Sequence, residues 1–219
     1  NLFGRPVALY LSNVNVAVLY ILAVTSISVY GITLAGWSSN NKYAMLGGLR
    51  ATAQMISYEL ALGMSFIGPI LLAGSMSLVD IVNSQRSMWN IVYTPLGFII
   101  YLFASLAELN RAPFDMPEAE QELTAGYHTE YSGMKFALFF MAEYIKMIAV
   151  SMIGSTLFLG GFRGPFVDQL PWLGPIYLLV KVILWMFVLI WVRATLPRIR
   201  YDRLMALGWK VMFPLALLN

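Results

Sequence analysis

Long apolar segments alternate with short polar ones along the chain. A helix that crosses a bilayer needs about 20 mainly apolar residues, and five segments reach that length. The sequence therefore predicts five membrane-spanning helices, at 14–37, 50–73, 91–110, 135–160 and 174–193. A sixth apolar segment begins near residue 204 and is too short to cross. We predict an all-α integral membrane protein, a transmembrane bundle of about six helices whose last helix is incomplete.

The connections contain the residues that bend and end helices. Pro69 and Pro95 fall inside predicted helices and are expected to bend or break them. The glycine pairs at 47–48 and 160–161 are expected to form turns. No internal repeat or linker divides the chain, so we predict a single transmembrane domain over residues 1–219. Because the chain lacks an initial Met and ends within an apolar segment, we expect it to be a fragment of a longer subunit.

Composition supports a membrane location and argues against several functions. The chain is 59% hydrophobic and 11% charged, whereas a soluble domain has about 25% charged residues. It has no cysteine and one histidine, His128, so no iron–sulfur ligand and no metal site is predicted. The net charge of +3 comes from basic residues scattered among loops, so we expect no nucleic-acid partner.

Lysine and arginine are distributed unequally between the two ends of the predicted helices. If the five helices alternate in direction, nine of the fourteen basic residues fall on one side and three on the other, while Lys146 and Lys181 lie within helices. The positive-inside rule then places the nine-charge side in the cytoplasm, or in the matrix of a mitochondrion. The nine are Lys42, Arg50, Arg111, Lys135, Arg193, Arg198, Arg200, Arg203 and Lys210, and the three are Arg5, Arg86 and Arg163.

Acidic residues gather in one connection, the segment AELNRAPFDMPEAEQEL and the residues after it. Part of this can be architecture, because Asp115 and Glu118 match a capping box and Pro117 suits a first helical turn. However, Glu118 and Glu122 would place like charges on one helical face, which costs about a few tenths of a kcal/mol. We interpret the cluster either as a solvated acidic loop or as a proton-handling group. Six of the eleven acids belong to it: Glu108, Asp115, Glu118, Glu120, Glu122 and Glu130.

Three acids lie within predicted helices. Glu59 lies in AQMISYELALG, Glu143 precedes Lys146 in FFMAEYIKMIAV, and Glu108 lies at the end of its segment. An ionised side chain at the bilayer centre costs about 2.5–3.5 kcal/mol, so such residues usually mark a proton or ion path. The structural alternatives are extension of Glu108 to the interface, an ion pair of Glu143 with Lys146, and burial of Glu59 as a neutral acid.

Three long segments resemble the H subunit (NuoH) family of respiratory complex I, the proton-pumping NADH:quinone oxidoreductase. The same subunit is the first mitochondrially encoded NADH dehydrogenase subunit in animals. The resemblance extends over essentially all 219 residues, and it implies that an N-terminal part with the first transmembrane helix is missing here. The segments are GWSSNNKYAMLGGLRATAQMISYELALG, AELNRAPFDMPEAEQELTAGYHTEYSGMKFALFFMAEY and RATLPRIRYDRLMALGWKVMFPLAL.

The resemblance implies roles that composition does not show. In that family the subunit joins the peripheral arm to the membrane arm, forms much of the quinone chamber, and starts a chain of carboxylates that leads to the antiporter-like subunits. No residue is assigned as catalytic. Proton-coupling roles are implied for Glu59, Glu108, Glu143, Asp115, Glu118, Glu120, Glu122 and Glu130. Positions at the quinone chamber are implied for Arg50, Arg111, Asp115 and Glu118.

The resemblance also implies partners. Quinone is the expected substrate, and this chain is expected to bind no cofactor, because flavin and iron–sulfur clusters reside in partner subunits. The expected partners are the peripheral-arm quinone-site subunits, small membrane subunits, antiporter-like subunits and lipid. The expected location is the cell inner (plasma) membrane, or the mitochondrial inner membrane for an organellar protein.

Other functions would also explain buried acids. The closest alternative is the homologous membrane subunit of a related hydrogenase or of a ferredoxin- or F420-linked dehydrogenase. A stand-alone channel or secondary transporter is another, although no inverted repeat is visible in the sequence. A purely structural scaffold is the third, and it predicts that replacing the buried acids leaves turnover unchanged.

Overall fold

A computed structural model describes residues 13–115, 126–165, 167, 170 and 172–219. The regular structure of these residues is entirely helical, which confirms the predicted fold class. Four helices are long and apolar enough to cross a membrane, so four of the five predicted spans are confirmed. They are α1 (Ala17–Ser38), α2 (Lys42–Ala73), α7 (Gly133–Phe158) and α8 (Leu173–Thr195).

The predicted span at 91–110 is wrong as a single crossing. It is divided into α4 (Asn90–Tyr93) and α5 (Pro95–Glu108), and α5 has 14 residues. Pro95 causes the break, because proline disfavours a helical conformation at the residue before it, and Thr94 has φ −125° and ψ 62°. At 1.5 Å per residue, α5 is about 21 Å long, shorter than the roughly 30 Å apolar thickness of a bilayer.

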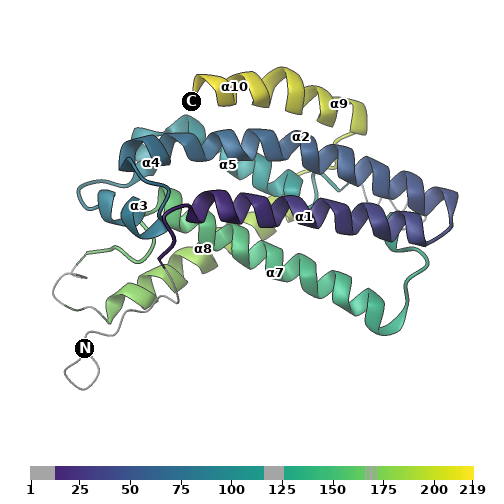
Figure 1. The fold of residues 1–219 in the computed structure, drawn as a ribbon, viewed down its shortest axis with the longest axis horizontal. Helices are drawn as coiled ribbons and strands as arrows, with labels where there is room; N and C mark the ends of the chain where they lie inside the picture. The colour runs from purple at the N-terminus through teal and green to yellow at the C-terminus, as the bar shows by residue number, and fades with distance from the viewer. Residues whose placement is uncertain (1–12, 116–125, 166, 168–169, 171) are drawn as a thin grey trace.

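Helices α1 and α2 form an antiparallel pair (Figure 1). Helix α2 begins at Lys42, well before residue 50, because the side chain of Asn41 accepts a hydrogen bond from the Tyr43 N–H at 3.0 Å. Pro69 does not end α2, which continues to Ala73.

The glycine pair at 47–48 is not a turn, contrary to the prediction, because it lies buried within α2. A Cβ atom added to Gly36 would lie 2.9 Å from the carbonyl oxygen of Ala44 and 3.2 Å from the Cα of Gly48. Small residues therefore allow the backbones of α1 and α2 to approach closely, as at many interfaces between membrane helices. The glycine pair at 160–161 does form a turn, with positive φ at both residues.

Helix α2 lies between α1 and the C-terminal segment (Figure 1). That segment consists of α9 (Tyr201–Leu207), a π-helical turn (Gly208–Met212) and α10 (Phe213–Leu218). Two buried polar residues of α2 bind α5, the turn after it and the C-terminal segment. Gln54 donates to the carbonyl oxygens of Ala107 and Phe114 at 2.8 and 2.9 Å, and the Tyr58 hydroxyl donates to that of Leu204 at 2.8 Å. These polar contacts fix α5 and the C-terminal segment on α2.

Candidate proton-transfer site

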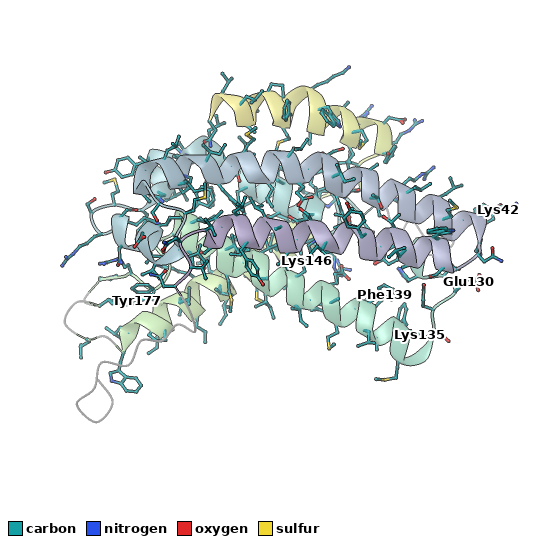
Figure 2. The ribbon with its side chains drawn as sticks, viewed as in Figure 1. Lys42, Glu130, Lys135, Phe139, Lys146 and Tyr177 are labelled. Atoms are coloured by element: carbon teal, nitrogen blue, oxygen red, sulfur yellow. The ribbon has the colours of Figure 1, made fainter. Side chains whose placement is uncertain are left out.

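Two ion pairs join the end of α5 to the middle of α7. The Nζ of Lys146 lies 3.2 Å from Oε1 of Glu108, and Arg111 pairs through Nε with the carboxylate of Glu143. The side chain of Glu108 is 4% exposed, so Glu108 is buried rather than extended to an interface. The structural alternative of a Glu143–Lys146 ion pair is not observed, because Lys146 pairs with Glu108 and Glu143 with Arg111. Figure 2 shows Lys146 near the middle of the molecule.

The end of α5 explains why two cations meet there. The last carbonyl groups of a helix carry a partial negative charge, and Glu108, the final residue of α5, adds a full one. Lys146 and Arg111 compensate both charges. The guanidinium of Arg111 also lies 5.1 Å from the ring centroid of Tyr144, a cation–π contact. Each buried carboxylate of this cluster therefore has a cation partner, as buried charges require.

A sharp turn directs Arg111 back toward α7. Asn110 has φ +51°, a left-handed conformation that Asn adopts more readily than most residues. The amide of Gln54 lies 3.3 Å from the side-chain oxygen of Asn110, and the Phe114 N–H donates to the Arg111 carbonyl at 2.9 Å. The turn is thus held by α2, which fixes the position of the Arg111–Glu143 pair.

Three of the four charged residues line a pocket of about 510 Å³ between α1 and α7. Glu108, Glu143 and Lys146 line it from one side, and Thr25 and Ser28 of α1 line it from the other. The second oxygen of Glu108, Oε2, is buried and has no hydrogen-bond partner among the described residues. Most of the pocket wall is apolar, but the pocket has room for water beside Glu108, and water is the ordinary partner of such an atom.

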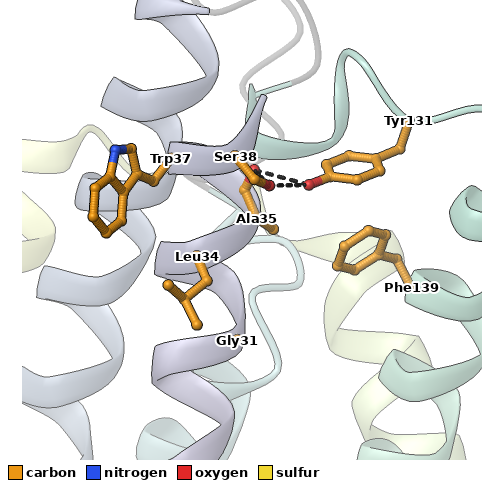
Figure 3. Close-up of a pocket in the computed structure, with 7 residues that line it drawn as sticks. All are labelled: Gly31, Leu34, Ala35, Trp37, Ser38, Tyr131 and Phe139. Carbon is orange, nitrogen blue, oxygen red and sulfur yellow. Dashed lines mark hydrogen bonds between the residues drawn. The ribbon is translucent and has the colours of Figure 1, made fainter. Parts of the chain in front are cut away.

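A second pocket, of about 420 Å³, follows the first along α1 (Figure 3). Gly31 and Phe139 line both pockets. The hydroxyl of Tyr131 donates to the carbonyl oxygen of Ala35 at 3.0 Å and lies 2.7 Å from the hydroxyl of Ser38. A second group of polar atoms therefore lies at the end of α1, separated from the ion pairs by Gly31 and Phe139.

Glu59 approaches the cluster from the interface of α1 and α2. Its carboxylate accepts a hydrogen bond from the hydroxyl of Ser26 on α1, and its side chain is half-buried. Ser26 lies between Thr25 and Ser28, which line the first pocket. The partner of Glu59 is thus a hydroxyl, whereas Glu108 and Glu143 have cations. The sequence prediction did not include Ser26, although three hydroxyl side chains in one apolar segment were a usable signal.

Of the other predicted site residues, Arg50, Asp115 and Glu130 do not line the pocket of this cluster. Arg50 lies over the ring of Tyr201, with 5.8 Å between the guanidinium carbon and the ring centroid. Glu130 is exposed and accepts a hydrogen bond from the side chain of Asn41 at 2.8 Å. Asp115 is half-buried, and its expected capping role involves residues outside the described part of the chain. The predictions for Glu118, Glu120 and Glu122 also lie outside the described residues.

Metal binding finds no support in the described residues. No group of three or more His, Cys, Asp or Glu side chains among residues 13–115, 126–165 and 172–219 could hold a metal ion. Proton transfer between carboxylates, hydroxyls and water is the chemistry that this arrangement permits.

These features define an integral membrane protein with paired acids buried between its helices. The family model described as NADH dehydrogenase matches residues 3–219, so the chain belongs to this family. The resemblance stated from the sequence is thereby confirmed.

Curated relatives agree with this assignment. The NADH-quinone oxidoreductase H subunit of Protochlamydia amoebophila is 55% identical over 216 residues, covering 99% of this chain and 65% of that protein. The H subunit of Thermomicrobium roseum is 54% identical over 228 residues, and an H subunit of Geobacter metallireducens is 53% identical over 218 residues. Each of these two matches covers 100% of this chain and 65% of the relative. The chain thus spans 65% of the length of these relatives.

Proposed function

We propose that the full protein is the membrane subunit that couples quinone reduction to proton translocation in a proton-translocating NADH:quinone oxidoreductase. The observation that carries the proposal is the two ion pairs, Glu108–Lys146 and Arg111–Glu143, because Glu108, Lys146 and Glu143 line one pocket. The names of the relatives, which are H subunits of NADH-quinone oxidoreductase, support it. No observation favours a hydrogenase subunit.

The geometry offers a physical basis for coupling. A quinone that gains two electrons takes up two protons, so its reduction changes the charge near any acid beside it. Arg111 belongs to the connection that leads on to Asp115, and it holds Glu143 at the same time. A displacement of Arg111 would remove the cation paired with Glu143, beside the pocket that Glu108 also lines.

The acids that we propose to take part in proton transfer include residues outside the pocket. Glu59 is the next proton site, because it reaches the same helix, α1, through Ser26. Arg50, Arg111, Asp115 and Glu118 are proposed to lie at the quinone chamber. The acids assigned to proton coupling after α5 are Asp115, Glu118, Glu120, Glu122 and Glu130.

The assembly around this subunit is also a proposal. The partners are the peripheral-arm quinone-site subunits, the small membrane subunits and the antiporter-like subunits, with flavin and iron–sulfur clusters in those partners. The membrane is the cell inner membrane, or the mitochondrial inner membrane for an organellar protein. The support is the respiratory-complex name of the relatives.

The test replaces each embedded acid by its amide in the complete membrane complex. Glu59→Gln, Glu108→Gln and Glu143→Gln keep the side-chain shape and remove titration, so each should lower quinone reduction and proton pumping about tenfold or more, which is roughly 1.4 kcal/mol of barrier. Electron transfer from NADH to a hydrophilic acceptor that bypasses quinone should persist. Asp202→Asn is the matched control, because Asp202 is 72% exposed and pairs with Arg200. Normal pumping in all three amide variants would refute the proposal.

A further inference from the structure

Two contacts between polar side chains link the packed faces of α1 and α2. In one, the hydroxyl of Ser26 donates to the carboxylate of Glu59. In the other, the hydroxyls of Thr33 and Thr52 lie 2.7 Å apart. Along each helix the two contacts stand seven residues apart, about two turns, so both belong to one row along the interface. Of the two, the Ser26 contact is the one that includes an ionisable group.

Glu59 depends on this contact within the described part of the chain. Among residues 13–115, 126–165 and 172–219, its carboxylate accepts a side-chain hydrogen bond from Ser26 alone and pairs with no Lys or Arg. Glu108 and Glu143, by contrast, each have a cation partner. Because a charge within a membrane helix is costly, the Ser26 hydroxyl is the group of this chain that stabilises ionised Glu59.

The Ser26 hydroxyl has two acceptors for its one proton. Its oxygen contacts Glu59 and also lies 2.9 Å from the carbonyl oxygen of Leu22. That carbonyl has other donors, because the Thr25 hydroxyl donates to it at 2.9 Å and the N–H of Ser26 donates to it within the helix. A carbonyl oxygen has two lone pairs. The Ser26 hydroxyl can therefore leave Leu22 for Glu59 without leaving a backbone group unpaired.

One hydroxyl can thus serve both charge states of Glu59. When Glu59 is ionised, the O–H of Ser26 donates to the carboxylate. When Glu59 is protonated, its own O–H donates to the Ser26 oxygen, and the Ser26 proton turns to the Leu22 carbonyl. The two arrangements differ by rotation of one O–H group, so no heavy atom has to move. The contact with ionised Glu59 is the stronger, because hydrogen bonds to a charged acceptor are roughly twice as strong as neutral ones.

We propose that Ser26 is the positioning residue of Glu59 in proton transfer, and that its hydroxyl turns between Glu59 and the Leu22 carbonyl as the acid loses and gains a proton. This inference rests on the proposed function, in which Glu59 is one of the acids that exchange protons. A lysine or arginine at position 26 would hold Glu59 in its ionised form, whereas a hydroxyl leaves both charge states accessible. Helix α1 therefore takes part in proton transfer beyond its share of the pocket wall.

Infrared difference spectra of the complete complex, recorded between acid and alkaline buffer, test the contact. The Glu59→Gln variant lacks the bands of Glu59 and so identifies them. Ser26→Ala should shift the Glu59 carboxylate band, because the carboxylate loses its donor, and Ser26→Thr, which keeps a hydroxyl, should restore it. Thr33→Val is the matched control, because it removes an α1 hydroxyl of the same row that contacts no acid. An unshifted band in Ser26→Ala would overturn the proposal.

Turnover of the same variants separates positioning from packing. Ser26→Ala should lower quinone reduction by the complete complex about tenfold, the effect of one hydrogen bond to a charged group, and Ser26→Thr should recover most of it. In a Glu59→Gln background, Ser26→Ala should cause no further loss, because its effect passes through Glu59. A similar loss in that background, or equal losses in Ser26→Ala and Thr33→Val, would identify a packing role and overturn the inference.

The inference and the proposed function fail in different ways. Impaired turnover in Glu59→Gln beside normal turnover in Ser26→Ala would overturn only the role of Ser26. Normal turnover in Glu59→Gln would remove Glu59 from the proposed function and the role of Ser26 with it. Electron transfer from NADH to a hydrophilic acceptor should persist in every variant, which shows that the complex is assembled.

Discussion

Glu108 is the carboxylate whose charge most depends on a neighbour. Its side chain is 4% exposed and stands at the carbonyl end of α5, where the helix dipole disfavours a negative charge. The groups that face it are Lys146 and Glu143 from α7, Arg111 from the following turn and Tyr101 from its own helix. Lys146 is the cation in direct contact. Lys146 is therefore the group whose removal should affect Glu108 most.

Lys146→Met tests this dependence. An unpaired buried carboxylate is expensive, by about 3–5 kcal/mol when its partner is removed, so Glu108 should take up a proton instead. Infrared difference spectra of the complex should then show an additional protonated-carboxyl band at neutral pH. The band should be absent in the double variant Lys146→Met, Glu108→Gln, and in Lys146→Arg, which keeps the positive charge. If Lys146→Met shows no such band, Lys146 does not control the charge of Glu108.

The sequence identified the acids of the site but not all of their partners. Glu59, Glu108 and Glu143 were conspicuous because each is charged within an apolar segment. Lys146 stands three residues after Glu143, which suggested an ion pair along one helix. The observed pairing depends instead on where α5 ends and on the left-handed turn at Asn110. Those are tertiary features, and no spacing in a single chain specifies them.

At the scale of helices, the packing of α1 on α2 depends on glycine. Gly36 and Gly48 face each other with no side chain between them, so one added methyl group meets backbone atoms. The sequence predicted a turn at 47–48 because glycine pairs are common in turns. In a membrane helix the same residues serve close packing, and the pattern alone does not separate these two uses.

Gly36→Ala should destabilise the protein measurably. Its Cβ would lie 2.9 Å from the Ala44 carbonyl oxygen, and overpacking of this kind lowers the free energy of unfolding by about 1–3 kcal/mol. Reversible unfolding in mixed micelles measures the change. Gly63→Ala, on α2, is the control, because the nearest atom to its added Cβ is Leu22 Cδ1 at 3.9 Å. Equal free energies of unfolding for the two variants would show that α1 and α2 can move apart enough to accept the added methyl group.

The connection between α7 and α8 depends on a single cation. Lys181→Met would leave the carbonyl oxygens of Leu159, Gly161 and Arg163 without their shared donor. We expect faster hydrogen–deuterium exchange in segment 159–165, which includes the Gly161 amide that donates to Ser155. Lys135→Met, at the exposed start of α7, should leave that segment unchanged. Unchanged exchange in Lys181→Met would mean that the hydrogen bonds of Gln85 to the end of α7 suffice to hold the connection.

At the scale of the whole molecule, the helices differ in how much surface they bury. In the most apolar 18-residue stretch of each helix, half of the residues are buried in α2, compared with 11% in α1 and α7 and 22% in α8. The sequence predicted the spans because each is apolar throughout, but for the same reason it did not predict which of them is central. The broad apolar faces of α1, α7 and α8 are exposed, and α2 is the central helix of the described part of the chain.

The nine-to-three distribution of basic residues predicts the orientation of this bundle, and cysteine labelling tests it. The chain has no native cysteine, so each introduced thiol in this subunit is unique.

Three positions should lie on one side of the membrane. Ser39 and Ser132 line one pocket where α1 ends and α7 begins. Thr195 is the last residue of α8, and because α7 and α8 cross in opposite directions, it should lie on the same side. Cysteines at these three positions should react with an impermeant reagent from the cytoplasmic or matrix side. Ser87, exposed between α3 (Leu78–Ser84) and α4, should react from the opposite side. We expect α4, α5 and the turn at Asn110 together to return the chain toward the start of α7, so the break at Pro95 does not alter this expectation. Labelling of Ser87 and Ser132 from the same side would show that this segment does not return the chain across the membrane.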